Sequence, residues 1–235
     1  MQSKRKVVVE SSGIAICRQL NNKESYILLC KRRITYEFME FVHGKYSDDW
    51  FKLTKLFNKM TAEEKTDILS GDFNIVWWRL NVSKNTNTKY VKMKEKYEKT
   101  ISRRGFIEMV QNSSDGELLW EIPKGRSKPD ETDDLSTAVR ELKEEINISR
   151  DSYTVLYSEI PTSTTITDYG VVYYNKFYLA ELNTNNVFKY KDKCPLEISS
   201  IKWCCREEIK YIPSIFTQQI LTIINIFEKY KKISV

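Results

Sequence analysis

Residues 120–148 read Trp-Glu-Ile-Pro-Lys-Gly-Arg-Ser-Lys-Pro-Asp-Glu-Thr-Asp-Asp-Leu-Ser-Thr-Ala-Val-Arg-Glu-Leu-Lys-Glu-Glu-Ile-Asn-Ile. This stretch is a loop with one glycine that leads into an amphipathic helix. Apolar residues recur at helical spacing and predict a face packed against a core, at Leu135, Ala138 or Val139, Leu142 and Ile146. We therefore expect an anchored helix whose acidic residues point outward.

The acidic face of this helix is the first sign of chemistry. Glu141, Glu144 and Glu145 lie three or four residues apart and share roughly one face. Like charges at this spacing repel by a few tenths of a kcal/mol per pair, about the size of a favourable pair. Three hard oxygen ligands favour Mg²⁺ or Mn²⁺, which would offset that repulsion. The alternative is an ordinary surface helix with a charged outer face.

The ends of the helix carry their own signals. Thr132 or a neighbouring Asp is expected as N-cap, with Asp133 and Asp134 in the first turn, where the helix dipole favours anions. Asn147 tolerates the left-handed conformation in which helices often end. The sequence thus predicts a helix that ends at about residue 147.

The loop and helix resemble the Nudix box, G-x5-E-x7-R-E-U-x-E-E-x-G-U, over residues 125–148. The matching positions are Gly125, Glu131, Arg140, Glu141, Glu144 and Glu145. Two positions depart from the pattern: the spacing from Glu131 to Arg140 is one residue too long, and Asn147 stands where the box has glycine. The three helical acids stay in register. The resemblance implies a metal-dependent pyrophosphohydrolase with a Nudix fold.

A second motif lies downstream, where Glu197-Ile198 leads to Ile201 and Trp203. Its β-branched and aromatic content predicts a strand. Glu-Ile-x-x-Ile-x-Trp resembles the segment that supplies a further catalytic carboxylate in eukaryotic messenger-RNA-decapping Nudix enzymes. This resemblance implies that Glu197 is a metal ligand or the general base. A surface Glu at a strand start is the alternative.

The resemblance extends along most of the chain to one group of the family, the decapping enzymes of African swine fever virus and related large DNA viruses. Three blocks carry it: Lys31 to Arg33 through Phe38-x-Glu40-Phe41-x-His43-x-x-Tyr46-Ser47, then residues 119–125, then Glu197-Ile198 to Trp203. It implies a viral enzyme that degrades capped messenger RNA. Diphosphoinositol polyphosphates are a second possible substrate.

The resemblance also implies roles for individual residues. Glu141, Glu144, Glu145, Glu197 and the backbone carbonyl of Lys124 would hold one or more Mg²⁺ or Mn²⁺ ions. Arg140 would orient a neighbouring box Glu. The candidate phosphate contacts are basic: Lys124, Arg126, Arg32 and Arg33. The products would be 7-methylguanosine diphosphate and a 5′-monophosphate RNA.

Composition bounds the class of protein. The chain has 235 residues, 30% of them charged, and no apolar stretch long enough to span a bilayer. Its first residues lack the apolar core of a signal peptide. The five cysteines show no metal-ligand spacing and are expected to be reduced and mostly buried. We expect a soluble cytoplasmic protein, in the host cytoplasm if the chain is viral.

The position of the Nudix motifs predicts an α+β Nudix fold, a mixed sheet between helices, interrupted by a helical insertion. Residues 1–35 and 113–235 form the Nudix domain, with short strands at Val7 to Val9, Gly13 to Cys17 and Tyr26 to Cys30. Residues 36–112 form the insertion, which is expected to bind RNA or to form a homodimer. Its helical signals include an N-cap at Asp48 or Asp49 and a Thr61–Glu64 capping box. Residues 217–232 are expected to form a closing amphipathic helix.

A basic segment within the insertion points to nucleic acid. Nine basic residues against two acidic ones give a local net charge of +7, at Arg79, Lys84, Lys89, Lys92, Lys94, Lys96, Lys99, Arg103 and Arg104. With Tyr90 and Tyr97 interleaved, the segment suits a track for RNA phosphates. A solvated helix face is the alternative.

Aromatic side chains are candidates to hold the cap, because a methylated guanine is a cation that prefers aromatic faces. The available residues are Trp50, Trp77, Trp78, Tyr173 and Tyr174, which the sequence does not rank. His43, the single histidine, is expected to have a structural or substrate-contacting role.

Three functions remain open from the sequence. The first is an RNA-decapping Nudix hydrolase, which the basic segment favours because small nucleotides need no such track. The second is a Nudix hydrolase of diphosphoinositol polyphosphates or dinucleoside polyphosphates. The third is a catalytically inactive RNA-binding module, against which the complete set of Glu141, Glu144 and Glu145 argues.

Overall fold

The chain folds into two compact units, seen in a computed structural model that describes residues 7–20, 24–80, 88–156, 162–168, 171–183 and 197–233. Unit 1 combines Met1–Lys31 with Trp120–Val235, and unit 2 is Arg32–Leu119. Unit 2 is therefore inserted into the chain of unit 1, and it contains the predicted 36–112 insertion.

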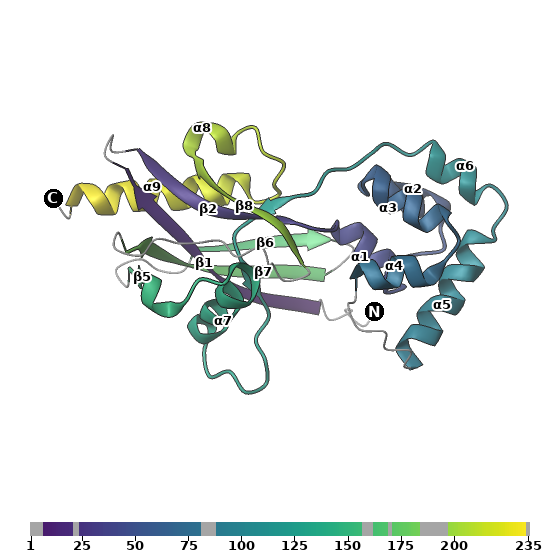
Figure 1. Cartoon of the computed structure of the whole chain (residues 1–235), viewed down its shortest axis with the longest axis horizontal. Helices are drawn as coiled ribbons and strands as arrows, with labels where there is room; N and C mark the ends of the chain where they lie inside the picture. Colours follow the sequence, from purple (N-terminus) through teal and green to yellow (C-terminus); the bar gives the residue numbers. More distant parts are fainter. Residues whose placement is uncertain are drawn as a thin grey trace, which may run out of the picture. The chain divides into compact units, whose positions relative to one another are not determined.

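Unit 1 is built on an eight-stranded mixed sheet (Figure 1). Its longest strands, β1 (Val7–Gln19) and β7 (Val171–Leu182), run parallel, with Val7 opposite Val171 and Cys17 opposite Glu181. The other strands are β2 (Ser25–Arg32), β3 (Trp120–Glu121), β4 (Lys124–Gly125), β5 (Tyr153–Val155), β6 (Thr162–Asp168) and β8 (Ile198–Cys205). The prediction of separate strands at 7–9 and 13–17 is wrong, because the ladder with β7 continues through the polar residues 10–12.

Two helices cover the sheet from opposite sides (Figure 1). Ile14 and Ile16 of β1 pack with α7 (Asp134–Ile146), whereas Ala15 and Cys17 face α9 (Thr217–Ile233). This alternation follows from the two-residue period of a strand. The short helix α8 (Arg206–Ile209) and the 3-10 turn Arg150–Ser152 complete the unit. The predicted α+β fold, a mixed sheet between helices, is confirmed.

Both predicted caps of α7 are present. The Asp133 side chain accepts a hydrogen bond from Ser136 N at 2.7 Å, so the N-cap is the aspartate that follows Thr132. Asn147 adopts φ 56°, the left-handed conformation, and its N–H donates to Lys143 O at 3.1 Å. Asn147 thus ends the helix where the Nudix box has glycine.

Substitutions at Asn147 test this account of the helix end. Glycine adopts positive φ without steric cost, so Asn147→Gly should change the free energy of unfolding by less than about 1 kcal/mol. Asn147→Val should cost about 1–2 kcal/mol, because a β-branched side chain is strained at positive φ, whereas asparagine tolerates it. Chemical denaturation measures both. Equal stability of the valine and wild-type proteins would contradict this account.

Unit 2 is helical (Figure 1). Its helices are α1 (Tyr36–Val42), α2 (Trp50–Phe57), α3 (Ala62–Leu69), α4 (Phe73–Leu80), α5 (Thr88–Ile101) and α6 (Phe106–Gln111). Asp49 caps α2 through Lys52 N at 2.9 Å, and Thr61 and Glu64 form the predicted capping box. Aromatic rings fill the core, where Phe41 contacts Phe57 and Tyr97 edge-on.

Two further sequence expectations can be compared with the described residues. None of their helices has the length and hydropathy needed to cross a bilayer. Cys17, Cys30 and Cys204 are buried, as expected of structural thiols, and Cys205 is partly exposed. Cys194 lies outside the described residues.

Candidate metal and catalytic site

The glycine of the loop allows the loop backbone to approach the acidic helix. Gly125 pairs with Ser12 across the β4–β1 ladder, which fixes the loop against the sheet. A Cβ atom on Gly125 would lie 2.1 Å from the Glu141 carboxylate. No side chain larger than hydrogen fits there without moving Glu141. The glycine is therefore needed for close approach, not for an unusual φ.

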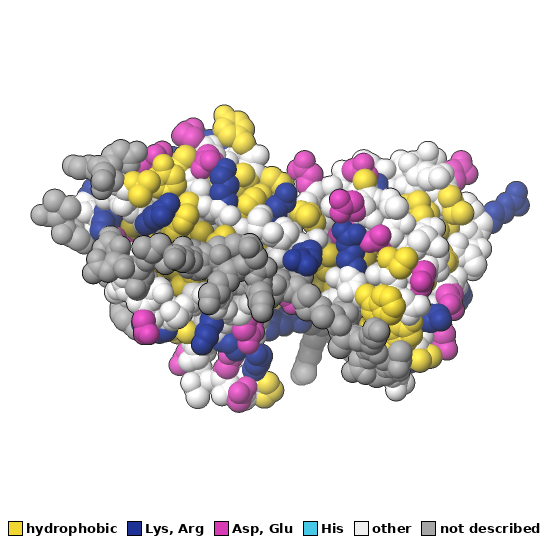
Figure 2. Space-filling view, viewed as in Figure 1, with side chains coloured by type: hydrophobic (Ala, Val, Ile, Leu, Met, Phe, Trp, Pro, Cys, Tyr) yellow, Lys and Arg dark blue, Asp and Glu magenta, His cyan; other side chains and the backbone are white. Residues whose placement is uncertain are grey.

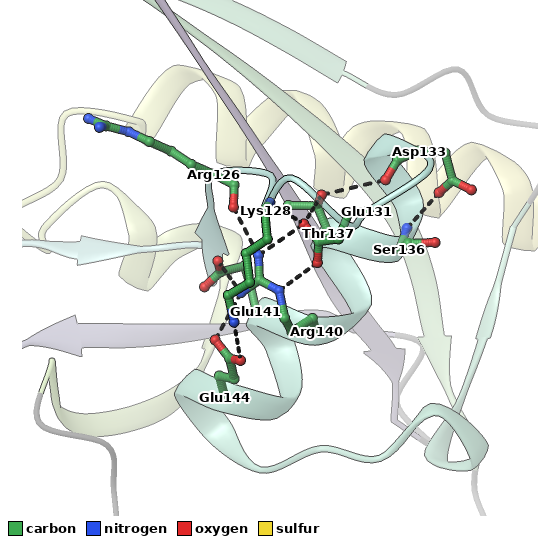
Figure 3. Close-up of polar contacts among 9 residues, drawn as sticks. All are labelled: Arg126, Lys128, Glu131, Asp133, Ser136, Thr137, Arg140, Glu141 and Glu144. Carbon is green, nitrogen blue, oxygen red and sulfur yellow. Dashed lines mark hydrogen bonds and ion pairs between the residues drawn. The ribbon is translucent and has the colours of Figure 1, made fainter.

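Arg140 is the centre of the polar cluster in Figure 3. Its Nε donates to Glu131 Oε1 at 2.5 Å, and its Nη1 donates to Glu141 Oε1 at 2.5 Å and to Glu144 Oε2 at 2.8 Å. Its Nη2 donates to the carbonyl of Arg126 at 2.9 Å. These bonds, led by the one to Glu131, raise the pKa of Arg140. One guanidinium thus holds three carboxylates and the loop backbone.

Glu131 joins this cluster although the spacing to Arg140 is one residue longer than in the box. Besides Arg140, it accepts from Thr137 Oγ1 at 2.7 Å and from Lys128 N at 2.8 Å. These bonds, with Arg140 first, lower the pKa of Glu131 to about 2. The extra residue is absorbed in the loop before α7, and the Glu131–Arg140 pair still forms.

The three helical acids occupy different environments, so the expectation that all point outward is wrong. Glu145 is only 5% exposed, and its Oε2 accepts from Lys124 N at 3.1 Å. Glu141 is partly buried, whereas the Glu144 side chain is half exposed and pairs with Lys128 at 2.9 Å. Glu145 is buried because it follows Ala138 and Leu142 along the core-facing stripe of α7.

Burial and mutual repulsion disfavour the ionised forms of two of these acids. The pKa of Glu145 is raised well above its usual value, first by burial and then by the charge of Glu121. Burial also raises the pKa of Glu141, against the opposing effect of Arg140. A cation between the two carboxylates would remove this cost.

Glu121 is a buried residue of the site that the sequence did not single out. It lies in β3, and its Oε2 accepts from Lys124 Nζ at 2.7 Å; the two side chains are 3% and 9% exposed. An acid and a lysine three residues apart, on either side of buried Ile122 and Pro123, are the signal that could have revealed the pair. Glu121 also adds negative charge beside Glu145.

The predicted phosphate contacts differ in exposure. Lys124, a predicted phosphate contact, directs its ammonium group to Glu121, and its side chain is largely buried. Arg32 is 8% exposed; its Nε donates to Ile34 O, and its guanidinium lies 4.0 Å from the Tyr36 ring centroid. Arg33 and Arg126 are exposed, and the Arg126 side chain extends away from the carboxylates in Figure 3.

Glu197 immediately precedes β8 and is exposed. Its negative charge contributes to the raised pKa of both Glu141 and Glu145. It therefore belongs to the same negative region as the box acids, although it is more than 50 residues away in the sequence. The fold brings the charges of Glu121, Glu141 and Glu197 close enough to Glu145 to raise its pKa.

The donor chemistry of this region suits a hard divalent cation. Among the described residues no group of three or more His, Cys, Asp or Glu side chains is already arranged to hold a metal ion. Arg140 and Lys128 hold Glu141 and Glu144 in the present arrangement. The raised pKa values of Glu141 and Glu145 nevertheless mark two carboxylates whose charge lacks full compensation.

The predicted RNA-contacting segment is only partly available to a ligand. Lys96 donates to Gly44 O at 2.7 Å and to Tyr46 O at 2.9 Å, and Arg103 donates to Asp48 O at 2.8 Å. Arg79 pairs with Asp67 and Glu63. Arg79 lies on α4, Lys96 on α5 and Arg103 just after α5. Together with buried Tyr90 and Tyr97, these three residues stabilise unit 2 itself.

The rest of the basic segment lies at the surface, except for Lys84, which is outside the described residues. The exposed members are Lys89, Lys92, Lys99 and Arg104, and Lys94 is partly exposed and lies 3.8 Å from Glu98. Lys89, Lys92 and Lys99 all lie on α5. The positive surface that remains is smaller than the sequence count indicates.

The candidate cap-binding aromatics also divide by burial. Trp77 belongs to the helical core at 4% exposure, whereas Trp50 and Trp78 are 36% and 49% exposed. Tyr173 and Tyr174 are partly buried in β7. His43 caps the end of α1, and burial lowers its pKa to about 4, so it stays neutral at physiological pH.

Comparisons with known proteins show which family the chain belongs to. The family model described as NUDIX domain matches residues 101–220. The mRNA-decapping protein g5R of African swine fever virus, isolate Warthog/Namibia/Wart80/1980, is 32% identical over 217 residues, which cover 86% of this chain and 87% of that protein. The g5R protein of the Badajoz 1971 Vero-adapted strain is also 32% identical, over 86% of each chain.

Among solved structures, a binary complex of a C. elegans Ap4A hydrolase aligns over 93% of this chain and 96% of that chain, with 17% identity and a TM-score of 0.49. The family match and the similarity to the viral proteins show that the chain belongs to the Nudix family. It is a Nudix hydrolase, an enzyme class whose members generally need divalent metal ions.

Proposed function

We propose that this Nudix hydrolase removes the cap from messenger RNA, releasing 7-methylguanosine diphosphate and a 5′-monophosphate RNA. The observation that carries the proposal is the extent of the similarity to g5R. It covers 86% of the chain, and unit 1 alone holds less than two thirds of the residues. The similarity therefore includes much of the helical unit, beyond the Nudix domain common to enzymes with other substrates.

The proposed chemistry assigns the acids to a Mg²⁺ or Mn²⁺ site. Glu141, Glu144, Glu145 and Glu197, with the Lys124 carbonyl, would hold the ion or ions. Such an ion lowers the pKa of a bound water and offsets the phosphate charge. The exposed Glu197 or a box Glu would accept the proton of the attacking water. Arg140 would keep Glu141 and Glu144 oriented through the bonds described above.

The helical unit would hold the body of the RNA. Its exposed basic residues Lys89, Lys92, Lys99 and Arg104 would neutralise backbone phosphates, and Arg33 and Arg126 remain candidates for phosphates nearer the cap. A capped messenger RNA is found in the cytoplasm, so the host cytoplasm is the proposed place of action. Dimerisation through the helical unit stays a prediction.

Neutralising Lys92, Lys99 and Arg104 with glutamine tests the RNA track. The triple variant should bind RNA more weakly, and the slope of log K against log salt should become shallower by about 2, since each contact with a single strand contributes about 0.7. Fluorescence anisotropy at several salt concentrations measures it.

Lys96→Gln is the matched control for the triple variant. Its charge is lost as well, but the structure commits Lys96 to two carbonyls of unit 2. We therefore expect a lower melting temperature and a salt slope close to that of the wild type. A wild-type slope in the triple variant would show that these residues form only a solvated surface.

A substrate panel separates the proposed function from its alternatives. Capped RNA, a diphosphoinositol polyphosphate and a dinucleoside polyphosphate are each incubated with the enzyme and Mg²⁺ or Mn²⁺, and kcat/KM is compared. Decapping predicts the highest kcat/KM for capped RNA. Preference for a small polyphosphate would favour the second function, and RNA binding without turnover of any substrate would favour an inactive binding module.

A further inference from the structure

The outward face of α2 combines an exposed aromatic ring with lysines. Phe51 is 68% exposed, and Lys55, one turn later, places its Nζ 4.2 Å from the centroid of the Phe51 ring. Lys52 is also exposed. Within the described part of the chain neither lysine has an ion-pair partner, so their charges are available to a ligand.

A second aromatic–cation pair lies beside this one. Trp50, at the first position of α2, is 36% exposed, and the Arg103 guanidinium lies 4.0 Å from its ring centroid. Arg103 is held in place by its bond to Asp48 O at 2.8 Å, just before the helix. Trp50, Phe51, Lys52, Lys55 and Arg103 form what we call the α2 face. Figure 2 shows hydrophobic side chains exposed among charged ones over the helical unit.

Core packing does not account for the exposed ring. The buried residues of α2 are Leu53, Leu56 and Phe57, which already supply its apolar stripe. Phe51 lies opposite that stripe, where an exposed aromatic ring gains nothing for folding. A ligand that pairs an aromatic surface with negative charge would benefit from both the ring and the adjacent cations.

We propose that the α2 face is a stacking site for unpaired bases of the RNA body, with Lys52 and Lys55 on the neighbouring phosphates. The proposal rests on the proposed function, since it assumes an RNA substrate, and it adds Phe51, Lys52 and Lys55, which lie outside the basic segment. The α2 face carries three cations, Lys52, Lys55 and Arg103, against two exposed acids just before it, Asp48 and Asp49, and this net positive charge favours a polyanion. Base stacking on an aromatic ring also tolerates any sequence, as a decapping enzyme requires.

Three substitutions of Phe51 test the stacking site. Loss of one base–aromatic stack weakens binding at least about fivefold. Phe51→Ala should therefore raise KM at least about fivefold for a long capped RNA and leave kcat/KM for a capped dinucleotide unchanged. Phe51→Trp should preserve the wild-type KM, because its ring also stacks. Phe51→Leu, which keeps apolar area without a π face, should behave as the alanine variant does.

The matched control is Ile75→Ala, which removes an exposed apolar side chain from α4. It should leave KM for the long RNA and kcat/KM for the capped dinucleotide unchanged. Equal KM values for long RNA in wild-type and Phe51→Ala proteins would overturn the stacking site while decapping itself stands. Wild-type behaviour of Phe51→Leu with loss in Phe51→Ala would also overturn stacking, because apolar area without a π face would then suffice for the contact. If neither capped substrate is turned over, the proposed function fails, and direct RNA binding by the Phe51 variants decides the stacking site by itself.

Discussion

Glu145→Gln should reduce kcat for cap hydrolysis by at least about two orders of magnitude, the lower end of what a group acting in proton transfer or metal binding contributes. The change removes one anionic oxygen with almost no change in shape. The amide oxygen can still accept the bond from Lys124 N that Glu145 accepts now. Turnover by single-substrate kinetics with Mg²⁺ and with Mn²⁺ measures the effect.

Stability provides the internal control for this variant. The pKa of Glu145 is raised by burial and by Glu121, so ionisation of Glu145 above its unfolded pKa opposes folding in the metal-free protein. The neutral glutamine removes that cost, and the melting temperature without metal should be at least as high as that of the wild type. Lys143→Gln, an exposed change on the same helix, should alter neither quantity. Wild-type turnover by Glu145→Gln would show that the Glu145 carboxylate is not needed for catalysis.

Gly125→Ala should disrupt the site from the loop side. The added methyl group would lie 2.1 Å from the Glu141 carboxylate, so Glu141 or the loop must move. The obstacle is the end of a side chain that can move, so we expect a cost in the free energy of unfolding at the low end of overpacking, about 1 kcal/mol. We also expect kcat to fall at least about tenfold, because misplaced catalytic groups lose orientation. Melting temperature and turnover are measured on the same preparation.

A double variant shows whether the clash is the cause. Glu141→Asp shortens the acid by one methylene, so adding it to Gly125→Ala should restore part of the lost melting temperature, although not the activity. Ser127→Ala, two residues further along the exposed loop, should leave both quantities unchanged. If Gly125→Ala melts and turns over as the wild type does, the close approach of the loop to Glu141 is not needed for the site.

The local features of the site were predictable because they depend on neighbours in the sequence. The Asp133 and Asn147 caps, the Asp49 cap and the Thr61–Glu64 capping box each depend on residues a few positions apart. The grouping of the box acids follows from helical periodicity in the same way. The resemblance to Nudix decapping enzymes predicted the family, which the comparisons confirm.

The environment of each charged residue depends on tertiary packing and was not predictable from spacing. Glu145 is acidic like Glu144, but the position of α7 on the sheet buries the first and leaves the second half exposed. Lys92 and Lys96 are both lysines of α5, but Lys96 donates hydrogen bonds to the carbonyls of residues 44 and 46, whereas Lys92 is exposed. The burial of the Glu121–Lys124 pair was not predictable, because charged residues in a short strand or loop are usually exposed to solvent.

Release of 7-methylguanosine diphosphate from cap-labelled RNA is the most direct test of the central claim, that the acids of α7 support metal-dependent removal of the cap. Wild-type and Glu145→Gln proteins are incubated with the labelled RNA in Mg²⁺, in Mn²⁺ and in a chelator, with long uncapped RNA as competitor. We predict release that requires both the metal and Glu145 and that uncapped RNA inhibits. No release by a folded wild-type protein with either metal would contradict the account.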